Sequence, residues 1–165
     1  MSGWACACGG DLAGGLQVME AELSRVSVMG PHPTYYAGLM AGIRLEDGKA
    51  AQALELVDTI LKTAREPGVG FFLSELYRLR GECLLQLDSS TFDEAVRDFE
   101  TAIATANRQH ARTFALRAAI SLARAWSAKG APEKGSGPLR EVVSAFGADD
   151  GPLELSTARQ ILSDL

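Results

Sequence analysis

Apolar residues recur along this chain at the spacing of an amphipathic α-helix. Near the start they follow one another at steps of four, three and four residues, at Leu12, Leu16, Met19 and Leu23. The same periodicity, interrupted by glycine, proline or capping side chains, predicts further helices over residues 34–45, 49–65, 71–87, 92–108, 113–128, 132–146 and 152–165. No segment alternates apolar and polar residues over more than a few positions. The pattern therefore indicates an all-α fold.

The helices pair up in a repeat of about forty residues that small side chains mark. The first helix of each pair carries a small residue at steps of 40 and 42 residues, at Ala41, Gly81 and Ala123. The second helix does so at steps of 42 and 40 residues, at Ala53, Ala95 and Gly135. Small residues return because two helices packed as a hairpin need a site where their backbones approach closely. A period in this range is typical of a stacked helical solenoid rather than one closed globule.

We expect a single helical-repeat domain over residues 1–165. Its parts are a partial pair at 3–29, complete pairs at 34–66, 70–109 and 112–146, and a C-terminal capping helix at 152–165. One helix in this series is weak, because Gly135, Gly137 and Pro138 each lower helix propensity, proline by about 3 kcal/mol in a helix interior. We expect that helix to kink, or to begin in earnest only at Pro138.

The start of the chain is predicted to hold only the end of a first helix. The stretch from Trp4 to Cys8 is typical of a helix end, and a complete second helix follows it. Trp4 and Leu12 are then short of packing partners, and exposed apolar surface of this kind normally marks an interface or a missing neighbour. We expect the chain to be the C-terminal part of a larger protein, and this N-terminal edge to be a surface for homodimer formation.

The composition indicates which cellular compartment and which kinds of partner suit this chain. The net charge is −5, with 16 basic and 21 acidic residues mixed along every helix. This mixture argues against binding nucleic acid, because phosphates require clustered lysines and arginines. No stretch approaches the ~20 uncharged apolar residues of a membrane span, and no secretory signal is visible. Three cysteines make an odd count, which suits a reducing cytoplasm.

No recognisable set of residues indicates catalysis, a cofactor or a metal. Cys6 and Cys8 lie two residues apart, so on a helix their side chains diverge by about 200°, which suits no common zinc chelate. His32 and His110 lie near turns, without a nucleophile or an orienting carboxylate in a recognisable set. The glycine-rich turns lack the Lys-Ser/Thr of a phosphate loop. We therefore expect a chain that is not an enzyme and that binds no cofactor or metal.

The small-residue pattern resembles that of tetratricopeptide repeats. It consists of a large and a small residue in the first helix, a glycine at the turn, a small residue early in the second helix and a bulky one four positions later. It occurs here as Met40-Ala41, Gly48, Ala53 and Val57, as Leu122-Ala123, Gly130, Gly135 and Leu139, and partly as Gly81, Ala95 and Phe99. The resemblance implies a right-handed solenoid of antiparallel helix pairs that binds proteins or peptides. Units of about 40 residues exceed the usual ~34.

Two segments, Glu75–Leu85 and Leu116–Arg124, carry a more specific likeness over residues 69–165. They resemble the C-terminal repeats of large bacterial signalling ATPases, in which a class III adenylate or guanylate cyclase domain, or a LuxR-type or winged-helix DNA-binding domain, precedes the ATPase module. This resemblance implies a non-catalytic interaction or sensor module, whose partners are other proteins or the other domains of the same regulator. The alternative is a stand-alone tetratricopeptide adaptor that binds extended peptides in its groove.

In tetratricopeptide-like stacks the first helices line a concave groove, which singles out a set of residues here. Those expected to face the groove are Tyr35, Glu75, Arg78, Glu82, Gln86, Arg117 and Arg124. Arg78 can pair with Glu82 within its helix, and Glu75 or Glu82 can reach an arginine of the next pair. One interpretation is a ladder of ion pairs that fixes the repeat-to-repeat geometry. The other is a groove that grips a peptide carboxylate or an acidic segment through Arg78, Arg117 and Arg124.

Overall fold

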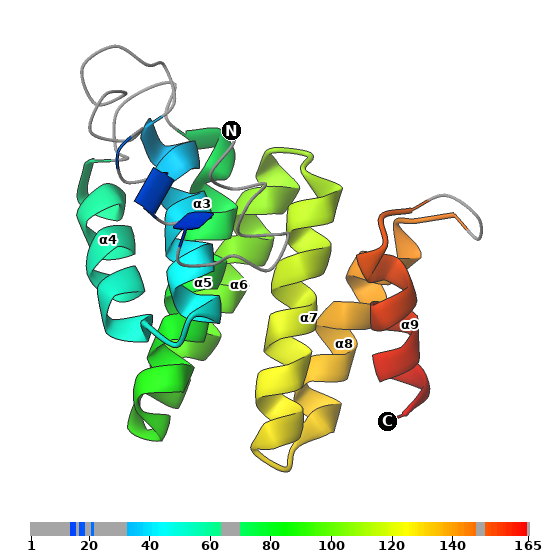
Figure 1. Cartoon of the computed structure of the whole chain (residues 1–165). Coiled ribbons are helices and arrows are strands. Elements are labelled where there is room, and N and C mark those ends of the chain that lie inside the picture. The colour runs from blue at the N-terminus through cyan, green and yellow to red at the C-terminus, as the bar shows by residue number, and fades with distance from the viewer. Residues whose placement is uncertain are drawn as a thin grey trace.

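The computed structural model describes residues 14–15, 17–18, 21, 33–63, 70–147 and 151–164, and all regular structure in them is helical. From Pro33 onwards the described α-helices are α3 (Pro33–Glu46), α4 (Ala50–Thr63), α5 (Leu73–Leu87), α6 (Phe92–Arg108), α7 (Arg112–Ala128), α8 (Pro132–Ser144) and α9 (Glu154–Ser163). Two short 3-10 helices, η1 (Gly70–Phe72) and η2 (Ser89–Thr91), precede α5 and α6. Successive helices form antiparallel hairpins that stack side by side, from α4 on one side of the view to α9 on the other (Figure 1).

Each helix forms where the apolar periodicity predicts it, because one stripe of its surface is buried. Helix α6 begins and ends at the predicted residues, and the other helices lie within two residues of the predicted bounds. The stripe of α6 consists of fully buried side chains at Ala95, Phe99, Ala102 and Ala106. Their spacing of four, three and four residues keeps them on one face, so the helix is fixed by burial of that face.

The small residues that mark the repeat lie where helices touch. A Cβ added to Gly135 would come 2.6 Å from the Cα of Ala123, so α7 and α8 pack backbone against backbone at this point. At Gly81 of α5, an added Cβ would come 2.7 Å from Cε1 of Phe99 in α6. Ala41 of α3 is likewise fully buried. The close backbone approach expected from the sequence is therefore present at Gly135, whereas Gly81 makes room for the ring of Phe99.

The core continues from hairpin to hairpin. One apolar cluster, containing Val57 and Leu76, joins α3, α4 and α5. The next, containing Phe99 and Leu122, joins α5, α6 and α7, and a third around Leu139 joins α6, α7, α8 and α9. Helices α5, α6 and α7 thus belong to two clusters each. An open array in which each unit packs only on its neighbours is the architecture of helical-repeat solenoids, so the predicted fold class is confirmed.

The expectation that α8 begins in earnest only at Pro138 is wrong, because this helix begins at Pro132 and passes through Pro138 to Ser144. An interior proline costs about 3 kcal/mol, but here tertiary packing opposes that cost. Leu139 is fully buried against its neighbours, and burying one leucine contributes about 1.5–3 kcal/mol. Gly137 also has no Cβ to collide with the proline ring, which relieves the usual restriction on the residue before proline. Packing therefore overrides the weak local propensity.

Several sequence expectations fall outside the described residues. The partial pair at 3–29, with its proposed dimer edge, does so almost entirely, as do Trp4, Cys6, Cys8 and His32. Within the part of the chain that the structure describes, no helix is long and apolar enough to cross a lipid bilayer.

Candidate binding groove

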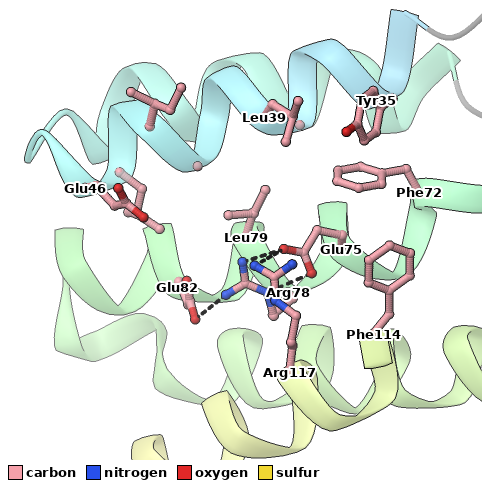
Figure 2. Close-up of a pocket in the computed structure, with 14 residues that line it drawn as sticks. Tyr35, Leu39, Glu46, Phe72, Glu75, Arg78, Leu79, Glu82, Phe114 and Arg117 are labelled. Atoms are coloured by element: carbon pink, nitrogen blue, oxygen red, sulfur yellow. Dashed lines mark hydrogen bonds and ion pairs between the residues drawn. The ribbon is translucent and has the colours of Figure 1, made fainter. Parts of the chain in front are cut away.

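A groove runs along the first helices of the stack, α3, α5 and α7. It consists of two cavities of about 540 Å³ each. The first is lined by residues of these helices and of η1, and the second continues towards the C-terminal ends of the same helices. Leu45, Glu46 and Glu82 line both cavities, so the two are parts of one depression. Figure 2 shows the first cavity, with α3 along one side, α7 along the other and α5 between them.

Aromatic side chains gather at the end of the groove where these three helices begin. The ring centroids of Tyr35 and Phe72 lie 5.1 Å apart, and those of Phe72 and Phe114 lie 5.5 Å apart, both edge to face. Gly38 makes room for this cluster, because a Cβ there would lie 2.7 Å from Cδ1 of Phe72. Leu39 points towards the cavity beside the rings (Figure 2). This end of the groove is therefore lined by apolar rings.

Arg78 forms the floor of the first cavity, with its side chain only 10% exposed. Its Nε and Nη2 donate to the two carboxylate oxygens of Glu75 at 2.9 and 2.7 Å, and its Nη1 lies 2.5 Å from Oε1 of Glu82 (Figure 2). Burial by itself lowers the pKa of Arg78, but the two carboxylates outweigh burial and raise the pKa above its ordinary value. The guanidinium therefore stays charged, and its hydrogen bonds are made within α5.

The same carboxylates connect α5 to α7. Arg117 of α7 contacts Oε1 of Glu75 through Nη2 at 2.9 Å, and its Nε lies 3.9 Å from Glu154 of α9. The hydroxyl of Ser121 donates to Oε1 of Glu82 at 2.7 Å. The pairing within α5 and the pairing from Glu75 to the next repeat are thus both present. These contacts fix the position of one hairpin relative to the next.

The structure places all seven sequence-predicted groove residues at the two cavities. Those that line the first are Tyr35, Glu75, Arg78, Glu82 and Arg117. Gln86 and Arg124, both exposed, line the second together with Glu82. Among the described residues no carboxylate pairs with Arg124, whereas Arg78 and Arg117 already have partners. A ligand carboxylate at either paired arginine must therefore compete with Glu75.

Sequence reasoning missed the apolar part of the groove and one acid. Phe72 and Phe114 were not singled out, although each lies nine residues before the small residue that marks its repeat. Glu46 was also missed, although it holds in α3 the position that the predicted Gln86 holds in α5. Aligning whole repeats on their small residues gives all three of these positions. Leu39 carries no comparable signal.

A second ion-pair cluster lies away from the groove and centres on Arg80. This side chain contacts Asp58 of α4 and both Glu94 and Asp98 of α6, each at 2.7 Å. Burial raises the pKa of Asp98, although Arg80 acts in the opposite direction. Arg80 lines neither cavity. Arg80 therefore links α4, α5 and α6 and has a structural role.

Two solved structures share this arrangement of helices. Both contain nearly identical TPR-like repeats of a kinesin light chain-like protein from Podosopora anserina. One matches with a TM-score of 0.71 and 15% identity, covering 98% of this chain and 80% of that chain. The other matches with a TM-score of 0.69 and 16% identity, covering 98% and 81%. No protein-family model and no curated protein matches the sequence. At this identity the likeness shows the fold alone, which is a solenoid of tetratricopeptide-like repeats.

The chemistry of the groove suits binding. Helical-repeat solenoids present an extended concave surface on which other molecules can bind. The groove here combines an aromatic end, a floor of paired charges and a more open end whose exposed lining is mostly apolar, with Glu46, Gln86 and Arg124 among its residues. Such a lining can hold apolar side chains in one part and hydrogen-bonding groups in another.

Proposed function

We propose that this chain is a protein-interaction module that holds an extended peptide segment in the groove along α3, α5 and α7. The observation that carries the proposal is the continuity of the two cavities through Leu45, Glu46 and Glu82. Each cavity falls within the range of about 300–1,000 Å³ that is usual for ligand pockets. A groove that continues past one pocket suits a chain of several residues better than a single small molecule.

A blocked groove tests this proposal. Leu39 faces the first cavity, so Leu39→Trp fills space that a peptide side chain would occupy. Leu87→Trp is the matched control, because Leu87 is 47% exposed and lines neither cavity. Peptides selected from a random display library on the wild-type chain are titrated by fluorescence anisotropy against both variants. We expect Leu39→Trp to weaken binding about tenfold or more, a change of about 1.4 kcal/mol, and Leu87→Trp to leave it unchanged.

Two results contradict the proposal. One is a library that yields no enriched peptide on a chain whose circular dichroism shows it to be folded. The other is a set of peptides whose affinity is the same for Leu39→Trp as for the wild type, since such peptides would bind elsewhere.

We further propose that the module belongs to a cytoplasmic bacterial signalling regulator whose cyclase or ATP-dependent transcriptional output lies in other domains. The likeness of Glu75–Leu85 and Leu116–Arg124 to the C-terminal repeats of signalling ATPases supports this proposal. The occupant of the groove is then a partner protein or another domain of the same regulator. Reading the genomic sequence upstream of Met1 tests it. An in-frame ATPase module supports the regulator, and an in-frame stop codon directly upstream favours the stand-alone adaptor.

A further inference from the structure

The two ends of the groove differ in electrostatic character. Helices α3, α5 and α7 run in the same direction, so their N-termini lie at the aromatic end (Figure 2). Their C-termini lie at the other end, near Glu46, Gln86 and Ala128. Each helix C-terminus carries a partial negative charge of about half an electron. Three of them side by side make this end of the groove electronegative before any side chain is considered.

Two carboxylates add to this potential. Glu46 has no ion-pair partner among the described residues. Glu82 uses Oε1 for both Arg78 and Ser121, and in the described part of the chain its Oε2 has no partner. Both glutamates line both cavities. Among the described residues that line the second cavity, Arg124 of α7 is the one cation.

We infer that the groove selects a segment with a lysine or arginine at Glu46 and Glu82 and a large apolar side chain among Tyr35, Phe72 and Phe114. This inference rests on the proposed function and names the class of its ligand. A ligand carboxylate is disfavoured because the arginines of the floor are already paired within the chain. The net charge of −5 also favours encounter with a basic partner at long range.

The helix geometry sets the spacing in the ligand. From Tyr35 to Glu46 the chain climbs eleven residues of α3, which is about 16 Å at about 1.5 Å per residue. An extended strand covers this distance in about five residues at about 3.3 Å each. The apolar and the cationic residue of the bound segment therefore lie about five positions apart.

Charge reversal at Glu46 tests the inference on the peptides selected from the random library. Glu46→Lys reverses one charge of the groove, and Glu55→Lys makes the same change on the exposed surface of α4. Both glutamates are exposed and neither side chain has an ion-pair partner in the described residues, so both variants keep the fold. We expect enriched peptides to pair an aromatic or long aliphatic residue with Lys or Arg about five positions away. Glu46→Lys should weaken them about tenfold, Glu46→Gln less, and Glu55→Lys not measurably.

Some results would overturn this inference and leave the proposed function intact, and others would overturn both. Peptides that Leu39→Trp weakens but that lack a basic residue, or that bind Glu46→Lys as well as wild type, overturn the inference and leave the groove as the binding site. Acidic peptides that Arg124→Glu weakens overturn it in the same way. A library that yields no peptide overturns both.

Discussion

Among single residues, Arg78 shows most directly how the groove floor is built. A buried charge is tolerated only where partners replace its lost water, and here Glu75 and Glu82 supply them. The pairing of Arg78 with Glu82 follows from their spacing of four residues on a helix. The burial of Arg78 does not follow from local sequence, because it depends on neighbouring helices covering α5. The ion pair of Arg78 with Glu82 could therefore be predicted from the sequence, but the burial of Arg78 could not.

Removing the charge of Arg78 should destabilise the protein, because its partner Glu75 is a buried carboxylate. Glu75 is 3% exposed, and Arg78→Met leaves its carboxylate with Arg117 as its remaining ion-pair partner. The change should therefore lower the free energy of unfolding by about 1.5–3 kcal/mol. Arg78→Met/Glu75→Met should recover much of that loss, as urea denaturation would measure. Arg97→Met on the exposed face of α6 is the control, with an expected change within about 0.5 kcal/mol. If the double change destabilised the protein by the sum of the effects of Arg78→Met and Glu75→Met alone, the two side chains would not be energetically coupled.

Cys83 should be inert while the chain is folded. Burial raises the pKa of its thiol to about 12, from an ordinary 9.0, and the side chain is fully buried. At pH 8 the reactive thiolate is then roughly a thousandfold rarer than in an unfolded chain. In a Cys6→Ser/Cys8→Ser background, a thiol-specific chromogenic disulfide reagent should react with Cys83 only as urea unfolds the protein. Rapid reaction at pH 8 without urea would show that the thiol is accessible.

At the scale of elements, the marker residues of the repeat were predictable because close helix approach leaves a sequence signature. Gly135 recurs in register with Ala53 and Ala95, and its contact with Ala123 explains why. The continuity of α8 was not predictable, since Pro138 argues locally for a break and only packing on α7 opposes it. Propensity is a local quantity, whereas packing depends on residues far along the chain.

Two glycine-to-alanine changes should have opposite effects on stability. Gly135→Ala places a Cβ 2.6 Å from the backbone of Ala123, so the hairpin must open and unfolding should become easier by about 1–3 kcal/mol. Among the described residues, the Cβ that Gly42→Ala adds to α3 meets only Cδ2 of Leu79, at an ordinary 3.8 Å. It should stabilise the helix by up to about 1 kcal/mol. Thermal and urea denaturation of both variants measure the difference, and equal effects would contradict the close approach of α7 and α8.

At the scale of the whole molecule, the sequence predicts the stack but not the shape of its groove. The forty-residue period and the buried stripes are sufficient for an open solenoid, because each hairpin needs only its neighbours. The groove depends on how α3 and α7 are placed across α5. The edge-to-face rings of Tyr35, Phe72 and Phe114 come from three different hairpins. No pattern within one hairpin predicts that these three rings come into contact. Aligning the repeats identifies only Phe72 and Phe114 as equivalent positions.

An open stack should also lose stability locally when one unit is damaged. Leu155 of α9 is 4% exposed and packs in the cluster that joins α6, α7, α8 and α9. Leu155→Ala should therefore lower the protection of amides in α9 and α8 by about 2–5 kcal/mol in native-state hydrogen exchange. Helix α4 packs in a different apolar cluster, which joins α3, α4 and α5. In an array of nearest-neighbour contacts the protection of its amides should therefore change much less. Leu153→Ala, at a side chain 92% exposed, is the control and should change neither region. A uniform loss across α4 and α9 would mean that the chain unfolds as one cooperative unit, which the succession of separate clusters argues against.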